Sequence, residues 1–196
     1  NYLPAREVTQ GSSDIIVAVL DHGTQLDHPD LNVSSKSYDT ETGRSPSQIW
    51  GNHGTACSGI ISAKTNNNLG VAGIAPNCPV MSISNQLMGT SDAPQKRADG
   101  FNWAWRNGAS VISNSWRSST FSELLEDAIQ SAMTNGRNGL GCVVTFSAGN
   151  YDSNTVGYPA RSLPDIIVVG ALSLSGKRKS STTIDNEGWW GSDYGT

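Results

Sequence analysis

The chain has 196 residues and a mass of 20.7 kDa, enough for one well-buried core and therefore for one domain or most of one. Its 13 Lys and Arg residues against 17 Asp and Glu give a net charge of -4, spread along the chain, so neither nucleic acid nor an anionic membrane is expected as a partner. No apolar run approaches the roughly 20 residues that a membrane-spanning helix requires.

Apolar runs that end at Gly, Asn or Pro alternate with amphipathic stretches along the chain. In chain order we expect a strand at 15–20, a helix at 53–63, a strand at 79–84, a helix at 93–107, a strand at 110–114, a helix at 122–135, and strands at 141–147 and 165–171. This alternation is typical of an α/β fold, a doubly wound parallel sheet with helices on both faces.

The helix expected at 122–135 has the clearest pattern, because its apolar residues recur at steps of three and four and so share one face. Thr120 or Ser122 is expected to cap its start, and Glu123 and Glu126 lie in the first turn, where the helix dipole favours acidic side chains. Asn135-Gly136 is the expected end.

The segment 173–193 is rich in Ser, Thr, Lys and Gly and is expected to form a surface loop, with a hairpin as an alternative. Its basic cluster Lys177-Arg178-Lys179 is interpreted as solvated. The adjacent Trp189 and Trp190 are expected to pack against other sequence.

Three cysteines, Cys57, Cys78 and Cys142, lie far apart and form no C-x-x-C motif. An odd number at such spacing indicates neither a zinc site nor a disulfide framework. Each lies among apolar or small residues, where a free cysteine packs as a small hydrophobic side chain. Buried thiols are therefore expected, and a single bridge is the alternative.

Three polar residues follow or begin the expected elements. Asp21 follows the apolar run that ends at Leu20, at the carboxyl end of a strand, where a carboxylate can orient an imidazole. His53 precedes a run of small residues at a helix start, which favours a neutral ring. Asn150 follows a strand through Ala148-Gly149, and its amide can donate to an oxyanion. Taken singly, each could equally be a turn or capping residue.

Taken jointly, these residues lie within motifs by which the chain resembles the subtilisin-like serine peptidases, the subtilases, from about Gly11 to Gly195. The motifs are V-A-V-L-D-H-G, H-G-T-A-C-S-G-I, N-N-N-L-G-V-A-G-I-A-P, S-N-S-W, S-A-G-N, T-V-G-Y-P-A and I-I-V-V-G-A, in the family's order and at similar spacing. The resemblance implies that Asp21 is the acid of an Asp-His-Ser triad, His53 the general base and Asn150 the oxyanion-hole donor.

The resemblance also implies how a substrate binds. An extended peptide would add as a strand along Ser113-Asn114-Ser115-Trp116 and along Thr90-Ser91-Asp92. The pocket for the residue before the scissile bond would lie between these segments and Ala148-Gly149-Asn150, with Gly157 at its floor. Because glycine has no side chain, a large uncharged residue is expected there.

The chain departs from the family pattern at three positions beside this groove. His22 follows the acid where Ser or Thr is usual, and Arg117 and Asp92 replace customary glycines. These added side chains are expected to narrow the groove or to add charged contacts, which leaves the other subsites undefined.

The sequence N-N-N-L-G-V at 66–71 resembles the family's calcium loop, with Asp30 as its distant carboxylate. The resemblance implies a Ca²⁺ site formed by oxygen atoms of Asp30, Asn67, Leu69 and Val71, since Ca²⁺ takes oxygen ligands. An Asn-rich turn without a metal is the alternative.

The family's G-T-S-x-A motif, which carries the nucleophile, does not occur in these residues, and Gly195-Thr196 is not interpreted as its start. Residues 1–196 are therefore expected to be an incomplete subtilase catalytic domain that is inactive alone. The implied partners are a polypeptide substrate, the rest of the catalytic domain and a propeptide, and the family favours a secreted protein.

The alternative function is a non-catalytic subtilase-like module that binds peptides by its strand edges. A doubly wound nucleotide-binding protein is disfavoured, because no glycine-rich phosphate loop follows the first strand.

Overall fold

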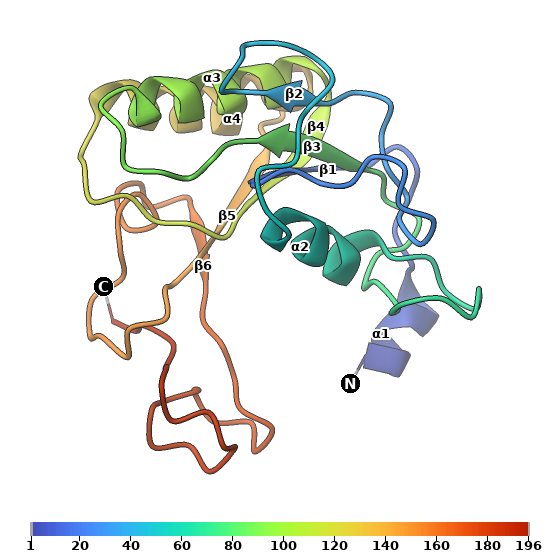
Figure 1. Cartoon of the computed structure of the whole chain (residues 1–196), viewed down its shortest axis with the longest axis vertical. Helices are drawn as coiled ribbons and strands as arrows, with labels where there is room; N and C mark the ends of the chain where they lie inside the picture. Colours follow the sequence, from blue (N-terminus) through green and yellow to red (C-terminus); the bar gives the residue numbers. More distant parts are fainter. Residues whose placement is uncertain (1, 196) are drawn as a thin grey trace.

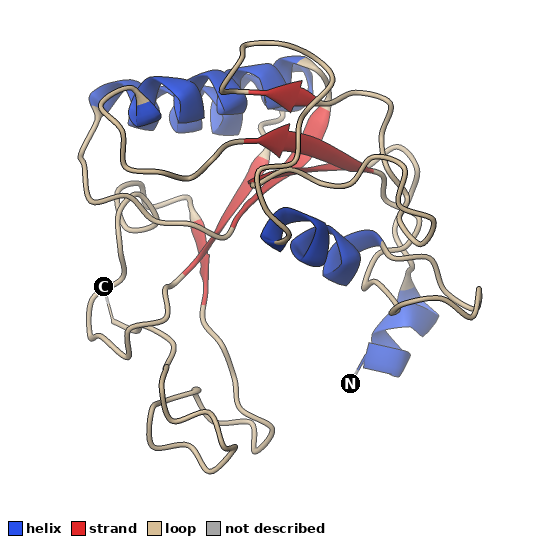
Figure 2. Ribbon diagram, in the orientation of Figure 1, coloured by secondary structure: helices blue, strands red, loops and turns tan. Residues whose placement is uncertain are grey.

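Figures 1 and 2 show the computed structural model of the chain, which describes residues 2–195, excluding the side chains of residues 2 and 3. One sheet of six parallel strands forms its centre, in the order β2-β3-β1-β4-β5-β6. The strands are β1 (Ile16–Asp21), β2 (Tyr38–Asp39), β3 (Val80–Ser84), β4 (Ala109–Asn114), β5 (Val143–Ser147) and β6 (Ile167–Val169). The helices are α1 (Tyr2–Val8), α2 (His53–Ser62), α3 (Ala93–Arg106) and α4 (Glu123–Gly139).

The helices cover both faces of the sheet. α3 and α4 pack side by side on one face, and α2 lies on the other (Figure 1). α1 lies at the edge of the molecule, apart from the sheet (Figure 2). The predicted α/β fold with helices on both faces of a parallel sheet is therefore confirmed.

The core lies between the sheet and the pair α3 and α4. Phe101 of α3 faces Phe146 of β5 with ring centroids 6.3 Å apart, and both are almost fully buried. Each fully buried side chain of this size contributes about 1.5–3 kcal/mol to stability. The same core cluster includes Leu20, Ile83, Ile112, Leu125 and Ile129.

α4 begins and ends as its sequence predicts. The Ser122 hydroxyl accepts a hydrogen bond from the Leu125 amide at 3.3 Å, which is the geometry of a helix N-cap. Gly136 has φ -58° and ψ 159°, so regular helical geometry stops at Asn135 although the helical hydrogen bonding is assigned as far as Gly139.

The outer elements differ more from expectation. β6 covers only Ile167–Val169 of the strand expected at 165–171, and it pairs with β5 alone. α1 and the two-residue strand β2 were not predicted, because neither segment is long enough to show a periodic pattern.

The segment after β6 extends away from the sheet (Figure 1), and its described residues, 170–195, contain no helix or strand. The interpretation of its basic cluster as solvated is wrong for Lys179, which is 2% exposed. The Lys179 ammonium donates to the carbonyl oxygens of Ser180, Glu187 and Trp190 at 2.9–3.0 Å. It also lies 4.8 Å from the centroid of the Trp190 ring, so this tryptophan packs inside the loop.

Cys57, Cys78 and Cys142 are all free thiols, as expected, and Cys57 is the only one of the three that is partly exposed. Within residues 2–195, none of the helices combines the length and the apolar character that a membrane crossing needs.

Candidate active site

Asp21 and His53 meet at the carboxyl end of β1. His53 Nδ1 lies 2.8 and 2.9 Å from the two carboxylate oxygens of Asp21. The Asp21 side chain is 1% exposed, whereas the His53 side chain is 51% exposed. A proton on Nδ1 is therefore directed to the carboxylate, and Nε2, which contacts Cys57 Sγ at 3.9 Å, is the ring nitrogen left to accept a proton.

The sheet register explains why residues so far apart in sequence converge. Leu20 of β1 is paired with Asn114 of β4, and Asn114 is paired with Phe146 of β5. One residue later, Asp21, Ser115 and Ser147 therefore lie in a row across the carboxyl edge of three parallel strands. Open α/β sheets bind their ligands at this edge.

His53 is the first residue of α2, and a glycine lets the helix approach the sheet. A Cβ atom at Gly54 would lie 2.4 Å from the carbonyl oxygen of Gly23, two residues after Asp21. Any side chain at position 54 would push α2 outward and lengthen the contact between Asp21 and His53. The run of small residues after His53 thus has the packing role that its sequence predicts.

Asn150 lies just beyond β5, on the loop that follows Gly149. Gly149 has φ +115°, a conformation that side chains other than glycine rarely adopt. The Asn150 side chain is exposed and forms no hydrogen bond within residues 2–195. Its amide is therefore available to a ligand at the strand edge.

The Trp116 side chain is buried, so a ligand beside Ser115-Trp116 would contact mainly the backbone of this segment. Trp116 is 7% exposed, and its ring packs edge-on against Phe146 at 5.0 Å. Ser115 Oγ lies 3.8 Å from Cys57 Sγ, which itself lies 3.9 Å from His53 Nε2. The structure thus brings Asp21, His53 and Ser115 around one thiol.

The Cys57 thiol is not set up as a nucleophile despite its place beside the imidazole. Burial raises its pKa, and the negative charge of Asp21 raises it further, against a smaller opposite effect of the hydrogen bond to Ser115. The thiol therefore stays protonated at neutral pH, whereas nucleophilic cysteines have a lowered pKa.

The expected open pocket above Gly157 is already partly filled. A Cβ atom at Gly157 would lie 3.5–3.8 Å from three atoms of the Arg117 side chain, so the Arg117 stem packs over this glycine. The Arg117 guanidinium continues to the Tyr151 ring, 4.1 Å from its centroid. The Arg117 side chain thus borders the space in which a large uncharged side chain is expected.

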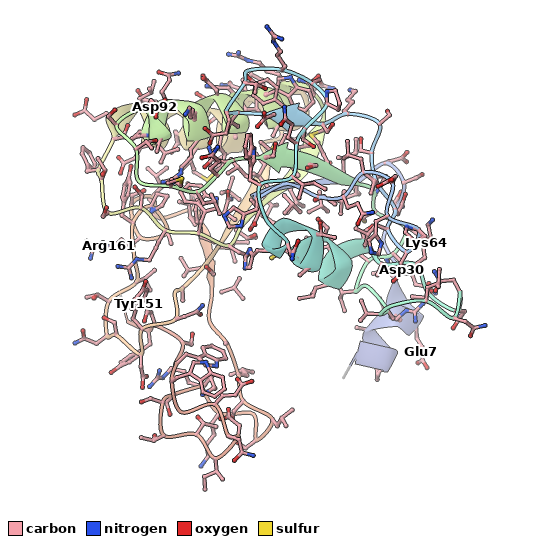
Figure 3. The ribbon with its side chains drawn as sticks, in the orientation of Figure 1. Glu7, Asp30, Lys64, Asp92, Tyr151 and Arg161 are labelled. Carbon is pink, nitrogen blue, oxygen red and sulfur yellow. The ribbon has the colours of Figure 1, made fainter. Side chains whose placement is uncertain are left out.

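The Asp30 loop lies on the opposite side of the molecule from Tyr151 and Arg161 (Figure 3). Asp30 is 3% exposed, and its carboxylate accepts from Asn67 Nδ2 at 2.7 Å and from the Val71 amide at 3.2 Å. The loop comes so close that a Cβ at Gly70 would lie 2.3 Å from Asp30 Oδ2. A buried carboxylate and a side-chain amide are residue types whose oxygen atoms Ca²⁺ takes as ligands.

A match to a family model shows which protein family this chain belongs to. The model described as "Subtilase family" matches residues 12–190. The chain is a subtilase.

Relatives agree with this assignment. The chain is 34% identical to subtilisin NAT of Bacillus subtilis subsp. natto over 181 residues, covering 89% of the chain and 45% of subtilisin NAT. It is 35% identical to a thermophilic serine proteinase of Bacillus sp. (strain AK1), covering 95% of the chain and 44% of that protein. A calcium-dependent protease of Trichormus variabilis is 30% identical, and the match covers 96% of the chain and 31% of that protease. The chain thus spans less than half the length of these curated relatives.

A solved structure supports the subtilisin-like fold. The prenylagaramide maturation protease PagA superposes with a TM-score of 0.72 over the whole chain and 64% of its own chain. At 24% sequence identity this likeness concerns the fold alone.

Two acidic residues that this subtilase uses near Asn150 were missed by sequence reasoning. Asp193 Oδ1 accepts from the amides of Tyr151 and Ser153 at 2.8 and 2.9 Å. Asp152 accepts from Arg178 at 2.6 Å. These contacts tie the loop after Asn150 to the segment after β6, and only the S-D-Y-G motif around Asp193, which resembles the family's S-N-Y-G, offered a signal.

Proposed function

We propose that this subtilase is a serine endopeptidase in which Asp21, His53 and Asn150 are catalytic and in which a serine outside these 196 residues is the nucleophile. The observation that carries the proposal is the pair of short contacts from Nδ1 of the half-exposed His53 to a buried carboxylate. The relatives described as proteases favour the same reaction.

In this proposal His53 Nε2 takes the proton from the serine hydroxyl as the serine oxygen bonds to the substrate carbonyl carbon. Asn150 donates to the oxygen that becomes negative. The C–N bond then breaks as the same proton passes to the leaving amine, and water repeats the sequence to release the acid. Asp21 orients the imidazole and stabilises its protonated form.

The substrate would lie along the edge formed by Ser115-Trp116 and Ala148-Gly149, with Gly157 beneath the residue before the scissile bond. The burial of the Trp116 side chain supports backbone pairing as the main contact at this edge. Polypeptides are therefore the proposed substrate class.

We further propose that the chain is one part of a catalytic domain. β6 exposes Ile167 and Val169 to 52% and 55%, and within residues 2–195 no helix covers them. Further sequence of the same protein would cover this edge and bring the serine, and a propeptide would precede the domain. Export from the cell is proposed by analogy with the family, with neither nucleic acid nor membrane as a partner.

A calcium ion is proposed at Asp30, Asn67, Leu69 and Val71, where it would stabilise the loop rather than take part in the reaction. The donor set and the relatives described as calcium-dependent proteases support it.

A chelator should lower the thermal midpoint of the complete protein, and Asp30→Ala should remove this response. The exposed Asp27→Ala is the matched control and should keep it. A midpoint unchanged by chelator would contradict the site.

A fluorophosphonate probe tests the main proposal, because it labels only an activated serine. The complete protein should be labelled at one serine in a G-T-S-x-A motif, and His53→Ala should abolish the labelling. The 196-residue chain should stay unlabelled, since loss of the serine in subtilisin costs about 10⁶ in turnover. Labelling of any serine within this chain would contradict the proposal. Peptide binding by a complete protein without labelling would support the binding module instead.

A further inference from the structure

A polar cavity of about 400 Å³ opens beside Asn150. Arg117 lies two residues after Ser115, Tyr151 directly follows Asn150, and both line this cavity together with Gly157. Figure 3 shows Tyr151 and Arg161 on the same side of the molecule. The remaining lining residues are Ser118, Ser119, Ser153, Thr155, Val156, Tyr158 and Arg161.

Arg117 is exposed, but both its stem and its guanidinium contact neighbouring residues. Its stem packs over Gly157, and its guanidinium lies 4.1 Å from the centroid of the Tyr151 ring. The backbone beside it is fixed as well, because the Ser118 amide donates to the Tyr158 carbonyl at 2.8 Å. Stacking on a ring uses the face of a guanidinium and leaves its N–H edge free, and this edge matches a carboxylate.

The cavity has positive charge and lacks an acid of its own. No carboxylate lines it, and within residues 2–195 neither Arg117 nor Arg161 forms an ion pair. The nearest acids are engaged elsewhere: Asp152 accepts from Arg178 and Ser181, and Asp193 Oδ1 accepts from two amides. Asp193 Oδ2 is buried next to Gly149 without a hydrogen-bond partner and does not line the cavity.

We propose that Arg117 makes this cavity the binding site for an acidic substrate side chain, Glu or Asp, at the residue directly before the bond that is cut. This inference rests on the proposed function, because Asn150 must hold the carbonyl of that residue for its side chain to enter here. A large apolar side chain would strip water from the Arg117 guanidinium without giving it a partner, which is unfavourable. A carboxylate replaces the lost water with charge-assisted hydrogen bonds.

The experiment uses the complete mature protein and four peptides that differ only in the residue before the scissile bond: Glu, Gln, Phe or Arg. The Glu peptide should have a kcat/KM about two- to fivefold above that of the Gln peptide, the range expected for a partly exposed charge pair. The Arg peptide should be the slowest. Comparing Glu with Gln isolates the charge, because the two side chains have nearly the same shape.

Arg117→Gln should remove the preference for Glu over Gln, and Arg117→Lys should keep part of it. Arg44→Gln is the matched control: Arg44 is exposed beside β2, at the far edge of the sheet, and its loss changes the net charge equally. The ratio of the two substrates should not change in this variant.

Faster cleavage of the Phe peptide by the unmodified protein would overturn the inference and leave the proposed endopeptidase intact. An equal loss of preference in Arg44→Gln and Arg117→Gln would also overturn it, since the effect would then come from net charge. Failure to cut any of the four peptides, together with absent fluorophosphonate labelling, would overturn the proposed function and this inference with it.

Discussion

At the scale of single residues, the difference in exposure between Asp21 and His53 separates their chemical roles. The Asp21 carboxylate is shielded from water and accepts from the His22 amide at 2.7 Å as well as contacting His53. It is therefore held rigidly and can act only on the imidazole. His53 keeps its outer nitrogen at the open edge, where a substrate and a serine would approach.

Asp21→Asn should lower kcat of the complete protein by about 10⁴ and leave KM little changed. The amide would hold the imidazole in the wrong tautomer, with its proton on the nitrogen that must accept. Steady-state kinetics on one peptide substrate would measure the loss, and circular dichroism would verify that the fold is retained. A loss of less than tenfold would contradict an orienting role for this carboxylate.

The charge of Asp152, in the loop that follows Asn150, makes folding stability depend on pH. Hydrogen bonds from the Ser181 amide and hydroxyl, followed by the Arg178 guanidinium, hold the Asp152 pKa well below its ordinary value of 3.8. A lowered folded-state pKa adds stability that is complete above pH 4 and is lost as the pH falls further.

Asp152→Asn should therefore lower the thermal midpoint at pH 7, and its difference from the unmodified protein should shrink as the pH is lowered from 4 to 2. Scanning calorimetry across this range would measure the difference. The exposed Asp14→Asn serves as control and should leave the midpoint unchanged at every pH. A difference that stays constant down to pH 2 would show that the carboxylate charge is not responsible.

Sequence reasoning succeeded for residues whose surroundings are set by their own segment. Asp21 and His53 follow from the end of a strand and the start of a helix, and parallel strands bring such ends together. The Arg117 conformation could not be predicted, since it depends on the Tyr151 ring from another segment and on the space above Gly157. The burial of Lys179 depends likewise on carbonyls up to 11 residues away.

At the scale of elements, long periodic segments were predictable and short ones were not. α4 has both a capping serine and a regular apolar face, and its predicted limits agree with the backbone. β2 is only two residues long and exists through its pairing with β3, which no local pattern reveals. The loop after β6 is held together by polar contacts, above all those of Lys179, rather than by apolar periodicity.

Lys179→Met should reduce the free energy of unfolding by about 3 kcal/mol, because it leaves three partly buried carbonyl oxygens without their donor. Urea denaturation followed by tryptophan fluorescence would measure the change, and Trp190 lies at the site. The exposed Lys177→Met two residues away should change stability by less than about 0.5 kcal/mol. Equal effects of the two substitutions would contradict a structural role for the buried ammonium.

At the scale of the whole molecule, the strands of the sheet differ in how far they are buried and in how many neighbours they pair with. β1 is paired on both sides, with β3 and β4, and its residues from Val17 to Asp21 are buried. β6 lies at the edge, all three of its residues are exposed, and the segment that follows contains mainly turns. Local stability is expected to fall from the centre of the sheet towards this edge.

Amide hydrogen exchange of the complete protein should therefore be slowest in β1 and β4 and fastest in residues 173–178 and 181–186. Mass spectrometry of peptic fragments would resolve these segments. Exchange in β6 shows whether further sequence covers this edge. Such a cover would slow exchange in β6 more than its pairing with β5 alone does. Strong protection of residues 173–178 would contradict the expected gradient.

The anchoring of the loop after Asn150 by Asp193 has a consequence for protein engineering. The amides of Tyr151 and Ser153 are held by a side chain about 40 positions later in the chain, at the end of the segment that follows β6. Shortening or grafting that segment would release the backbone beside Asn150 and leave the contact between Asp21 and His53 intact. Under the proposed function, such a redesigned variant would keep its KM and lose kcat.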